Sequence, residues 1–220
     1  MIDIKEADYH VALATSAADI SEISSIDDLA FAGNRGMNEK LLRRVEENGA
    51  LLILCHTPTG YIVGEAQFLF SAIPDMPYTF AHPVGYCYGV AIRPTFQKHG
   101  LGKVLMQGVW EVALSKGLSE VRLSVRVENY PSLKLMFGQG FHVIEYYKDF
   151  HSPNKARSPR LIMSKSVAKR KYEESNVFIP VTFFDSSAEG TAHKKIAGLL
   201  QAGYIGVDVN REGIFFAHLL

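Results

Sequence analysis

The chain has 220 residues, with 23 basic and 23 acidic side chains, so its formal net charge is zero. This length suits one domain, or one domain with a subdomain, and the balanced charge gives no electrostatic basis for nucleic acid or an anionic membrane as the main partner. No apolar run approaches the roughly 18 residues that a membrane-spanning helix needs.

The first fifty residues predict a short strand and two helices. The N-terminus lacks the basic-then-apolar pattern of a secretory signal, so we expect a cytoplasmic protein. A strand is predicted at 11–14, and Ser16 or Asp19 can cap a helix whose isoleucines recur three residues apart (Ile20, Ile23 and Ile26). A second helix is predicted from Glu39 to Glu47.

Two apolar runs joined by Thr-Pro-Thr-Gly predict a β-hairpin over 50–70. Cys55 lies in the first run and Cys87 in a later one, and we expect two buried free thiols in preference to a disulfide. Glu65 lies inside the return strand. It either faces water on an alternating strand or acts as a general base whose pKa is raised by partial burial.

A strand, a glycine-bearing loop and a helix follow one another over 84–116. The loop reads Gln97-x-x-Gly100-x-Gly102, which is neither a Walker A nor a Rossmann spacing. Backbone N–H groups at a helix N-terminus bind anions, and glycine lets a diphosphate approach the main chain. Taken alone, the loop is either a phosphate cradle or an ordinary strand-to-helix turn.

Another strand and helix follow. Residues 120–127 alternate between apolar and polar side chains, which predicts a strand with one buried face. Asn129 can cap a helix over 132–137, which Gln-Gly-Phe ends. A similar pattern in 169–220 predicts a βαββ unit, which is either a degenerate half-repeat of 120–167 or an unrelated extension that covers the sheet edge.

Two of these stretches resemble the motifs of one family. Val90-Ala-Ile-Arg-Pro with the glycine loop resembles motif A of the GNAT acetyl-CoA-dependent N-acyltransferases. Asn129-x-x-Ser-Leu-x-Leu-Met-x-x-x-Gly-Phe resembles motif B, in the same order and at the usual separation. The resemblance covers roughly 10–168, so we expect a GNAT domain over 1–168. About fifty residues do not easily bury a core alone, so the extension at 169–220 should pack on that domain or on a partner in a homodimer.

The resemblance implies an α/β (α+β) fold with a mixed, mostly antiparallel sheet flanked by helices. It implies acetyl-CoA as cofactor and transfer of acetyl to a primary amine of a small molecule or peptide by direct attack in a ternary complex. In the family this strand pairs with pantetheine and the loop wraps the diphosphate. Two helices at the position of the two predicted here flank the acceptor site, which makes 30–37 a candidate substrate-side lip. The implied coenzyme contacts are Val90, Ala91, Ile92, Gln97, Lys98, His99, Gly100, Leu101, Gly102, Lys103 and Asn129.

Glu65 is the first choice of general base and Tyr88 the second. No metal is expected, because no His, Cys and Asp cluster has ligand spacing. The tyrosine of the family's motif B falls on Met136, whose thioether cannot donate a proton. Either the thiolate leaves without an acid, or Tyr88, Tyr130 or a water replaces it, or the protein binds acyl-CoA without transferring the acyl group.

The sequence also leaves undecided which amine accepts the acetyl group. Glu145-Tyr146-Tyr147 resembles the paired tyrosines that line the peptide groove in members of the family that acetylate protein N-termini. The alternative is a strand with one buried and one exposed tyrosine. The rival function is a non-catalytic acyl-CoA-binding regulatory protein, and a nucleotide-phosphate enzyme is disfavoured because the Walker lysine and acidic metal ligands are absent.

Overall fold

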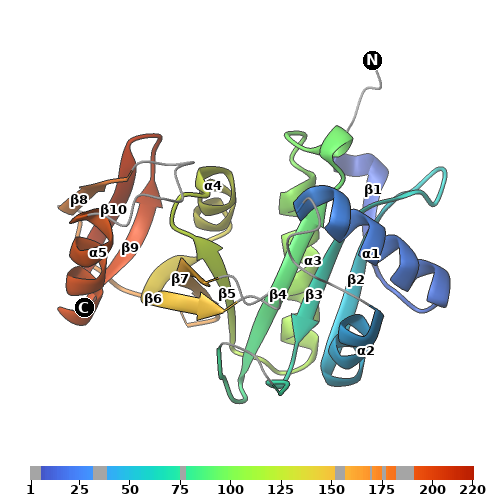
Figure 1. The fold of residues 1–220 in the computed structure, drawn as a ribbon, viewed down its shortest axis with the longest axis horizontal. Coiled ribbons are helices and arrows are strands. Elements are labelled where there is room, and N and C mark those ends of the chain that lie inside the picture. Colours follow the sequence, from blue (N-terminus) through green and yellow to red (C-terminus); the bar gives the residue numbers. More distant parts are fainter. Residues whose placement is uncertain are drawn as a thin grey trace. The chain divides into compact units, whose positions relative to one another are not determined.

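The computed structural model describes residues 6–31, 39–74, 78–151, 157–168, 170–174, 177–181 and 191–220. The chain forms two compact units, each described here by itself. The first unit holds Met1–Val121 with Ser152–Lys155, and the second holds Arg122–His151 with Ala156–Leu220. Figure 1 colours the elements of both units in chain order.

The first unit is a four-stranded antiparallel sheet in the order β1-β2-β3-β4. Its elements are a 3-10 turn at Glu6–Asp8, β1 Tyr9–Leu13, α1 Ala17–Phe31, α2 Glu39–Asn48, β2 Gly49–His56, β3 Ile62–Leu69, β4 Val84–Ile92, a 3-10 turn at Pro94–Phe96, and α3 Leu101–Ser115. The predicted hairpin is confirmed by the pairing of β2 with β3.

Helix α1 follows the predicted pattern. Ile20, Ile23 and Ile26 are all buried, as their spacing requires. Ser16 and Asp19 cap the helix together: the Asp19 backbone N–H donates to Ser16 Oγ at 3.1 Å, and the Ser16 N–H donates to Asp19 Oδ2 at 3.0 Å. This reciprocal cap satisfies two N–H groups that a helix start leaves without partners.

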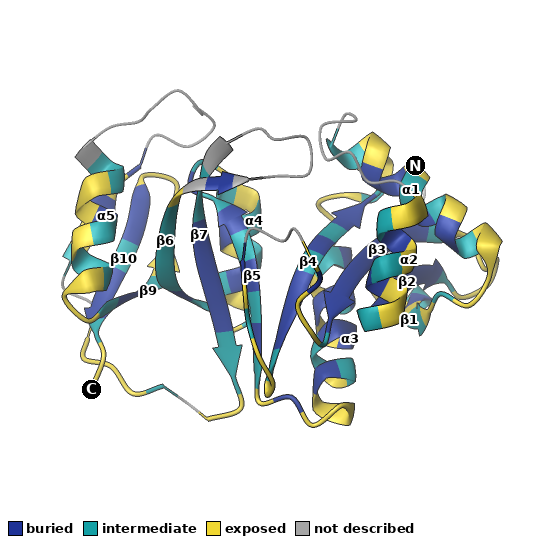
Figure 2. Cartoon of the chain, turned by 60° about the horizontal axis from the view of Figure 1, so that its bottom comes forward, coloured by how far each residue is buried: buried dark blue, intermediate teal, exposed yellow. Residues whose placement is uncertain are grey.

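Helices cover both faces of the first sheet. Cross-strand partners share a face, and one such row consists of Val11, Leu54, Gly64 and Ile92. This row faces α3, because a Cβ added at Gly108 of α3 would lie only 2.6 Å from Val11 Cγ1. Helices α1 and α2 also contact β3, so β3 is buried along almost its whole length (Figure 2).

The second unit is a sheet in the order β5-β7-β6-β9-β10-β8. Its elements are β5 Glu120–Arg126, α4 Tyr130–Gly138, β6 His142–His151, β7 Arg157–Ser166, β8 Val177–Pro180, α5 Thr191–Gln201, β9 Tyr204–Val209 and β10 Gly213–His218. The apolar face of β5 is buried as its alternation predicts (Val121, Leu123 and Val125).

The second unit contains two βαββ halves. In β5-α4-β6-β7 and again in β8-α5-β9-β10, the last strand lies between the first and the second. The halves meet where β6 pairs antiparallel with β9, and α4 contacts β9 while α5 contacts β6. This matched strand order is what the half-repeat interpretation predicts.

The α/β class with a mostly antiparallel sheet and a C-terminal βαββ segment is confirmed. The predicted substrate-side lip at 30–37 lies outside the described residues from 32 onward. Among the described helices, none is long and apolar enough to cross a membrane.

Candidate functional site

The glycine loop between β4 and α3 has an unusual backbone. Lys98 has a φ of 67° and Gly100 a φ of 80°, so two of three consecutive residues lie in the left-handed region. The Gln97 side chain fastens the loop to the strand, because its Nε2 donates to the Ile92 carbonyl at 3.0 Å. Residues 97–100 are exposed, so the loop lies at the protein surface.

The loop leads into the N-terminus of α3. Gly100 is the N-cap, and its carbonyl accepts the first helical bond from the Lys103 N–H at 2.8 Å. The first N–H groups of a helix have no acceptor inside the helix, and the helix dipole adds positive charge there. Exposed Lys98 and Lys103 stand in the same loop and first turn. The main chain, the missing Cβ of Gly100 and two cations together suit a diphosphate.

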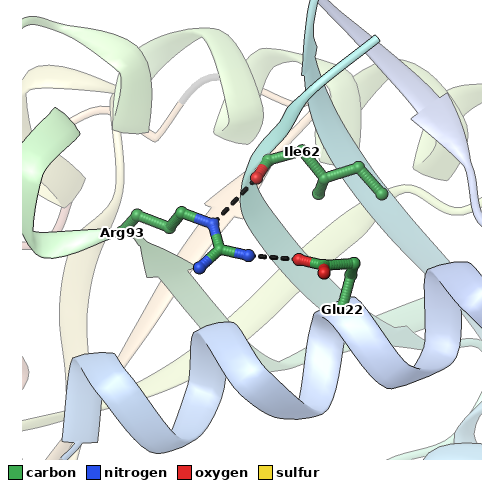
Figure 3. Close-up of polar contacts among 3 residues, drawn as sticks. All are labelled: Glu22, Ile62 and Arg93. Carbon is green, nitrogen blue, oxygen red and sulfur yellow. Dashed lines mark hydrogen bonds and ion pairs between the residues drawn. The ribbon is translucent and has the colours of Figure 1, made fainter.

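Arg93 holds the strand end from which this loop starts. Its Nε donates to the Ile62 carbonyl at 2.9 Å, and its guanidinium pairs with Glu22 of α1 (Figure 3). The guanidinium carbon also lies 5.2 Å from the ring centre of Tyr61, which in turn contacts Phe96. The loop is therefore tied to β3 and to α1.

Glu65 is fully buried, at 0% exposure, and the interpretation that it faces water is wrong. That interpretation assumed one solvent-exposed face for β3, whereas helices cover both. Glu65 follows Gly64, whose row faces α3, so the Glu65 carboxylate is on the opposite face. Gln67 Nε2 donates to Glu65 Oε2 at 3.1 Å, which satisfies one oxygen of this buried carboxylate.

Tyr88 occupies an irregularity in β4. Gln67 pairs with Gly89 and Phe68 pairs with Cys87, so Tyr88 between them is the extra residue of a β-bulge. Bulges re-aim side chains and are common beside active sites. Tyr88 is half-buried. Ala91 is the cross-strand partner of Glu65, so both candidate bases belong to the same strand pair as the predicted pantetheine contacts.

The motif B residues belong to the second unit. Asn129 Oδ1 accepts the Ser132 N–H at 3.2 Å, which confirms the predicted helix cap. Met136 is only 3% exposed and forms part of the core. Its thioether is therefore a packing group in the described structure, in keeping with its inability to donate a proton.

The two tyrosines of β6 are both half-buried, so the alternative of one buried and one exposed tyrosine is wrong. Their rings contact different neighbours: Tyr146 lies 5.7 Å from His193 of α5, and Tyr147 lies 6.1 Å from Phe150. Burial, and then the negative charge of Glu145, raise the pKa of Tyr147.

Three features of the first unit were missed from sequence. Gln67 could have been found, because residues two apart on a strand share a face. The pairing of Arg93 with Glu22 had no local signal, and neither had the position of Glu6, whose carboxyl group lies against Gly100. No group of histidine, cysteine, aspartate or glutamate side chains within the described ranges is placed to hold a metal ion.

The sequence model of the Acetyltransferase (GNAT) family matches residues 20–141, which is more than half of the chain and includes both motifs. The chain belongs to this family. A curated relative of this GNAT chain, the glucosamine 6-phosphate N-acetyltransferase of Trypanosoma brucei brucei, is 33% identical over 79 residues. Those residues make up 36% of the chain and 52% of the relative, so the chain spans about half the length of that protein.

Solved structures share the GNAT fold. The ribosomal-protein-S18-alanine N-acetyltransferase of Escherichia coli matches 77% of the chain and 99% of its own, with a TM-score of 0.59 and 17% identity. A GNAT family acetyltransferase from Elizabethkingia anophelis with acetyl-CoA bound matches 73% and 99%, with a TM-score of 0.57 and 15% identity. At these identities the likeness concerns the fold alone.

Proposed function

We propose that this GNAT chain transfers an acetyl group from acetyl-CoA to a primary amine of a small molecule or a peptide. The left-handed glycine loop at the start of α3, fastened to β4 by Gln97, is the observation that carries the proposal. Acetyl-CoA, when bound, supplies the acetyl group as an activated thioester. The sugar amine and the ribosomal-protein alanine in the names of two similar proteins are the acceptor classes to test first.

The chain's own part is to hold the coenzyme and to prepare the amine. We assign the pantetheine contacts to the main chain of Val90, Ala91 and Ile92, and the diphosphate contacts to residues 97–103. Backbone N–H groups of the strand at 90–92 would polarise the thioester carbonyl. Positioning of the amine against that carbonyl supplies much of the rate.

We assign the general base to Glu65, with Tyr88 as second choice. An ammonium group must lose a proton before its nitrogen can attack, and Glu65 would accept that proton through water. Its complete burial supports this role, because a desolvated carboxylate is a stronger proton acceptor than an exposed one. Tyr88, on its bulge in the strand paired with β3, is the second candidate for this proton transfer.

The test measures CoA thiol release with sugar amines and with peptides that begin with alanine. Glu65→Gln keeps the shape of the side chain and removes the base, so it should lower kcat by about 10²–10⁴-fold and leave the Kd for CoA unchanged. Tyr88→Phe is the matched comparison. A full loss in Tyr88→Phe with normal activity in Glu65→Gln moves the base to Tyr88, and full activity in both variants refutes the assignment.

The second candidate function is acyl-CoA binding without transfer. The family match does not favour it. It rests on Met136, which stands where the family's motif B has a tyrosine and cannot donate a proton. Binding of CoA by calorimetry, without thiol release on any amine tested, would establish this alternative and overturn the first.

We also infer a cytoplasmic location, because Cys55 and Cys87 are buried and form no disulfide, and cytosolic proteins keep their thiols reduced. The homodimer remains a prediction. Light scattering checks it, because a dimer has twice the molar mass of the single chain. Loss of activity when the protein is kept in a disulfide-forming buffer would agree with the inferred location, and formation of a Cys55–Cys87 disulfide in the native protein would contradict it.

A further inference from the structure

An acidic side chain lies against the glycine loop. Glu6, the first residue of the 3-10 turn before β1, places its carboxyl group beside Gly100. A Cβ added at Gly100 would lie 2.9 Å from the carboxyl carbon of Glu6 and 3.3 Å from its Cγ, with Oε1 nearer still. The missing side chain of Gly100 therefore makes the room that the Glu6 carboxylate takes.

The position of Glu6 is held by ordered structure next to it. The carbonyl of Asp8 accepts the Thr57 N–H at 2.8 Å, and Tyr9 begins the pairing of β1 with His56 of β2. Glu6 is thus two residues from a fixed point of the sheet. The fold thus places its carboxylate beside the N-terminus of α3, where the helix dipole attracts anions.

A carboxylate and a diphosphate are both anions, and both are attracted to the same N–H groups and the same bare backbone. We propose that Glu6 is an affinity-determining residue of the coenzyme site: its carboxylate occupies the diphosphate position in the empty protein and is displaced when CoA binds. The proposal rests on the coenzyme site of the proposed function. The two anions compete, so the affinity for CoA is lowered by the fraction of protein in which Glu6 occupies the loop.

The competition has two consequences of opposite sign. In the empty protein the Glu6 carboxylate stabilises the start of α3, so its removal lowers the stability to unfolding. In the presence of CoA the same removal frees the loop, so the affinity rises. A residue with a purely structural role would lower both quantities together.

The experiment compares Glu6→Gln with the wild-type chain by calorimetry with CoA and by urea unfolding without it. The expected result is a Kd for CoA that is about twofold to fivefold tighter, together with a lower urea midpoint. Glu6→Lys should tighten binding further, because it adds a cation. The matched control is Asp8→Asn, which removes one negative charge from the same 3-10 turn and should leave the Kd near that of the wild type.

An unchanged or weaker affinity in Glu6→Gln overturns the proposal, and so does an equal change in Asp8→Asn, which would indicate a general charge effect. If wild type and variant both bind CoA equally well, only the assignment of Glu6 fails. If neither binds CoA while both are folded by circular dichroism, the proposed function fails and the role of Glu6 fails with it.

Discussion

Arg93 at the end of β4 and Glu22 of α1 form an ion pair at the point where the strand ends and the glycine loop begins (Figure 3). The Arg93 side chain is 11% exposed and the Glu22 side chain 45%, so the cation is the more buried partner. Because Arg93 also donates to the Ile62 carbonyl, the pair joins a helix, a strand and the start of the loop. Removal of Arg93 should therefore lower the free energy of unfolding more than removal of Glu22.

Arg93→Met should lower the free energy of unfolding by about 2–3 kcal/mol, because it leaves the Ile62 carbonyl without its charged donor and removes the stacking on Tyr61. Glu22→Gln should cost less than about 1 kcal/mol, since Glu22 is partly in water. A double-mutant cycle in urea measures both, and calorimetry should also find weaker CoA binding in Arg93→Met. Equal costs for the two variants would contradict the asymmetry.

Gly100 and Gly117 form a matched pair at the two ends of α3. Both have positive φ, 80° and 70°, but a Cβ meets Glu6 at Gly100 and nothing within 4 Å at Gly117. Alanine at either position should cost about 1–2 kcal/mol of stability from left-handed strain. Only Gly100→Ala should weaken CoA binding, because only this glycine belongs to the proposed site. A strain of about 1–2 kcal/mol in the site corresponds to a Kd for CoA that is about fivefold to thirtyfold higher. Calorimetry with CoA and urea unfolding of both variants check this. Equal affinities of the two variants for CoA would contradict the assignment of the glycine loop to the coenzyme site.

The join between the two βαββ halves can be tested at Gly206 of β9. A Cβ there would lie 2.8 Å from Val143 Cβ of β6, so Gly206→Ala forces the paired strands apart. We expect a loss of about 1–3 kcal/mol in the second unit. Gly198→Ala in α5 is the control: a Cβ there meets nothing within 4 Å, and alanine should stabilise the helix by about 0.5–1 kcal/mol. Urea unfolding distinguishes the two, and a neutral Gly206→Ala would show that the join tolerates separation.

His142 of β6 should make the stability of the second unit depend on pH. Burial, and then the positive charge of Arg170, lower the pKa of His142 below its usual 6.5. Above pH 6.5 the residue is neutral in both states and its contribution is full. As the pH falls below 6.5 the unfolded chain takes up the proton first, so stability declines until the pH has passed through the folded pKa.

The variant His142→Gln removes this titration. Urea unfolding between pH 7 and pH 5 should show a smaller decline in its unfolding free energy than in the wild type. The ring of His142 also contacts Tyr172 at 5.4 Å, so some stability is lost at pH 7 as well, but that loss does not change with pH. Equal pH slopes for both proteins would exclude His142 as the source.

Short-range patterns in the sequence determined many of the helices and strands of this protein, and its family motifs. The isoleucine spacing of α1, the cap at Asn129 and the alternation of β5 each depend on side chains within a few residues of one another. Motif A and motif B are local in the same sense, and their order along the chain indicates the family without any knowledge of tertiary contacts. Helix caps and strand alternation need no distant partner, which is why sequence alone could predict them.

The tertiary structure decided what distant segments do to one another. The burial of Glu65 depends on helices that cover both faces of β3, and a strand pattern cannot show whether its second face is covered. Arg93 finds Glu22 across 71 residues of chain, and Glu6 reaches Gly100 only because β1 pairs with β2. Such contacts form when packing brings distant segments together. Their partners are therefore fixed by the whole fold and carry no local signature in the sequence.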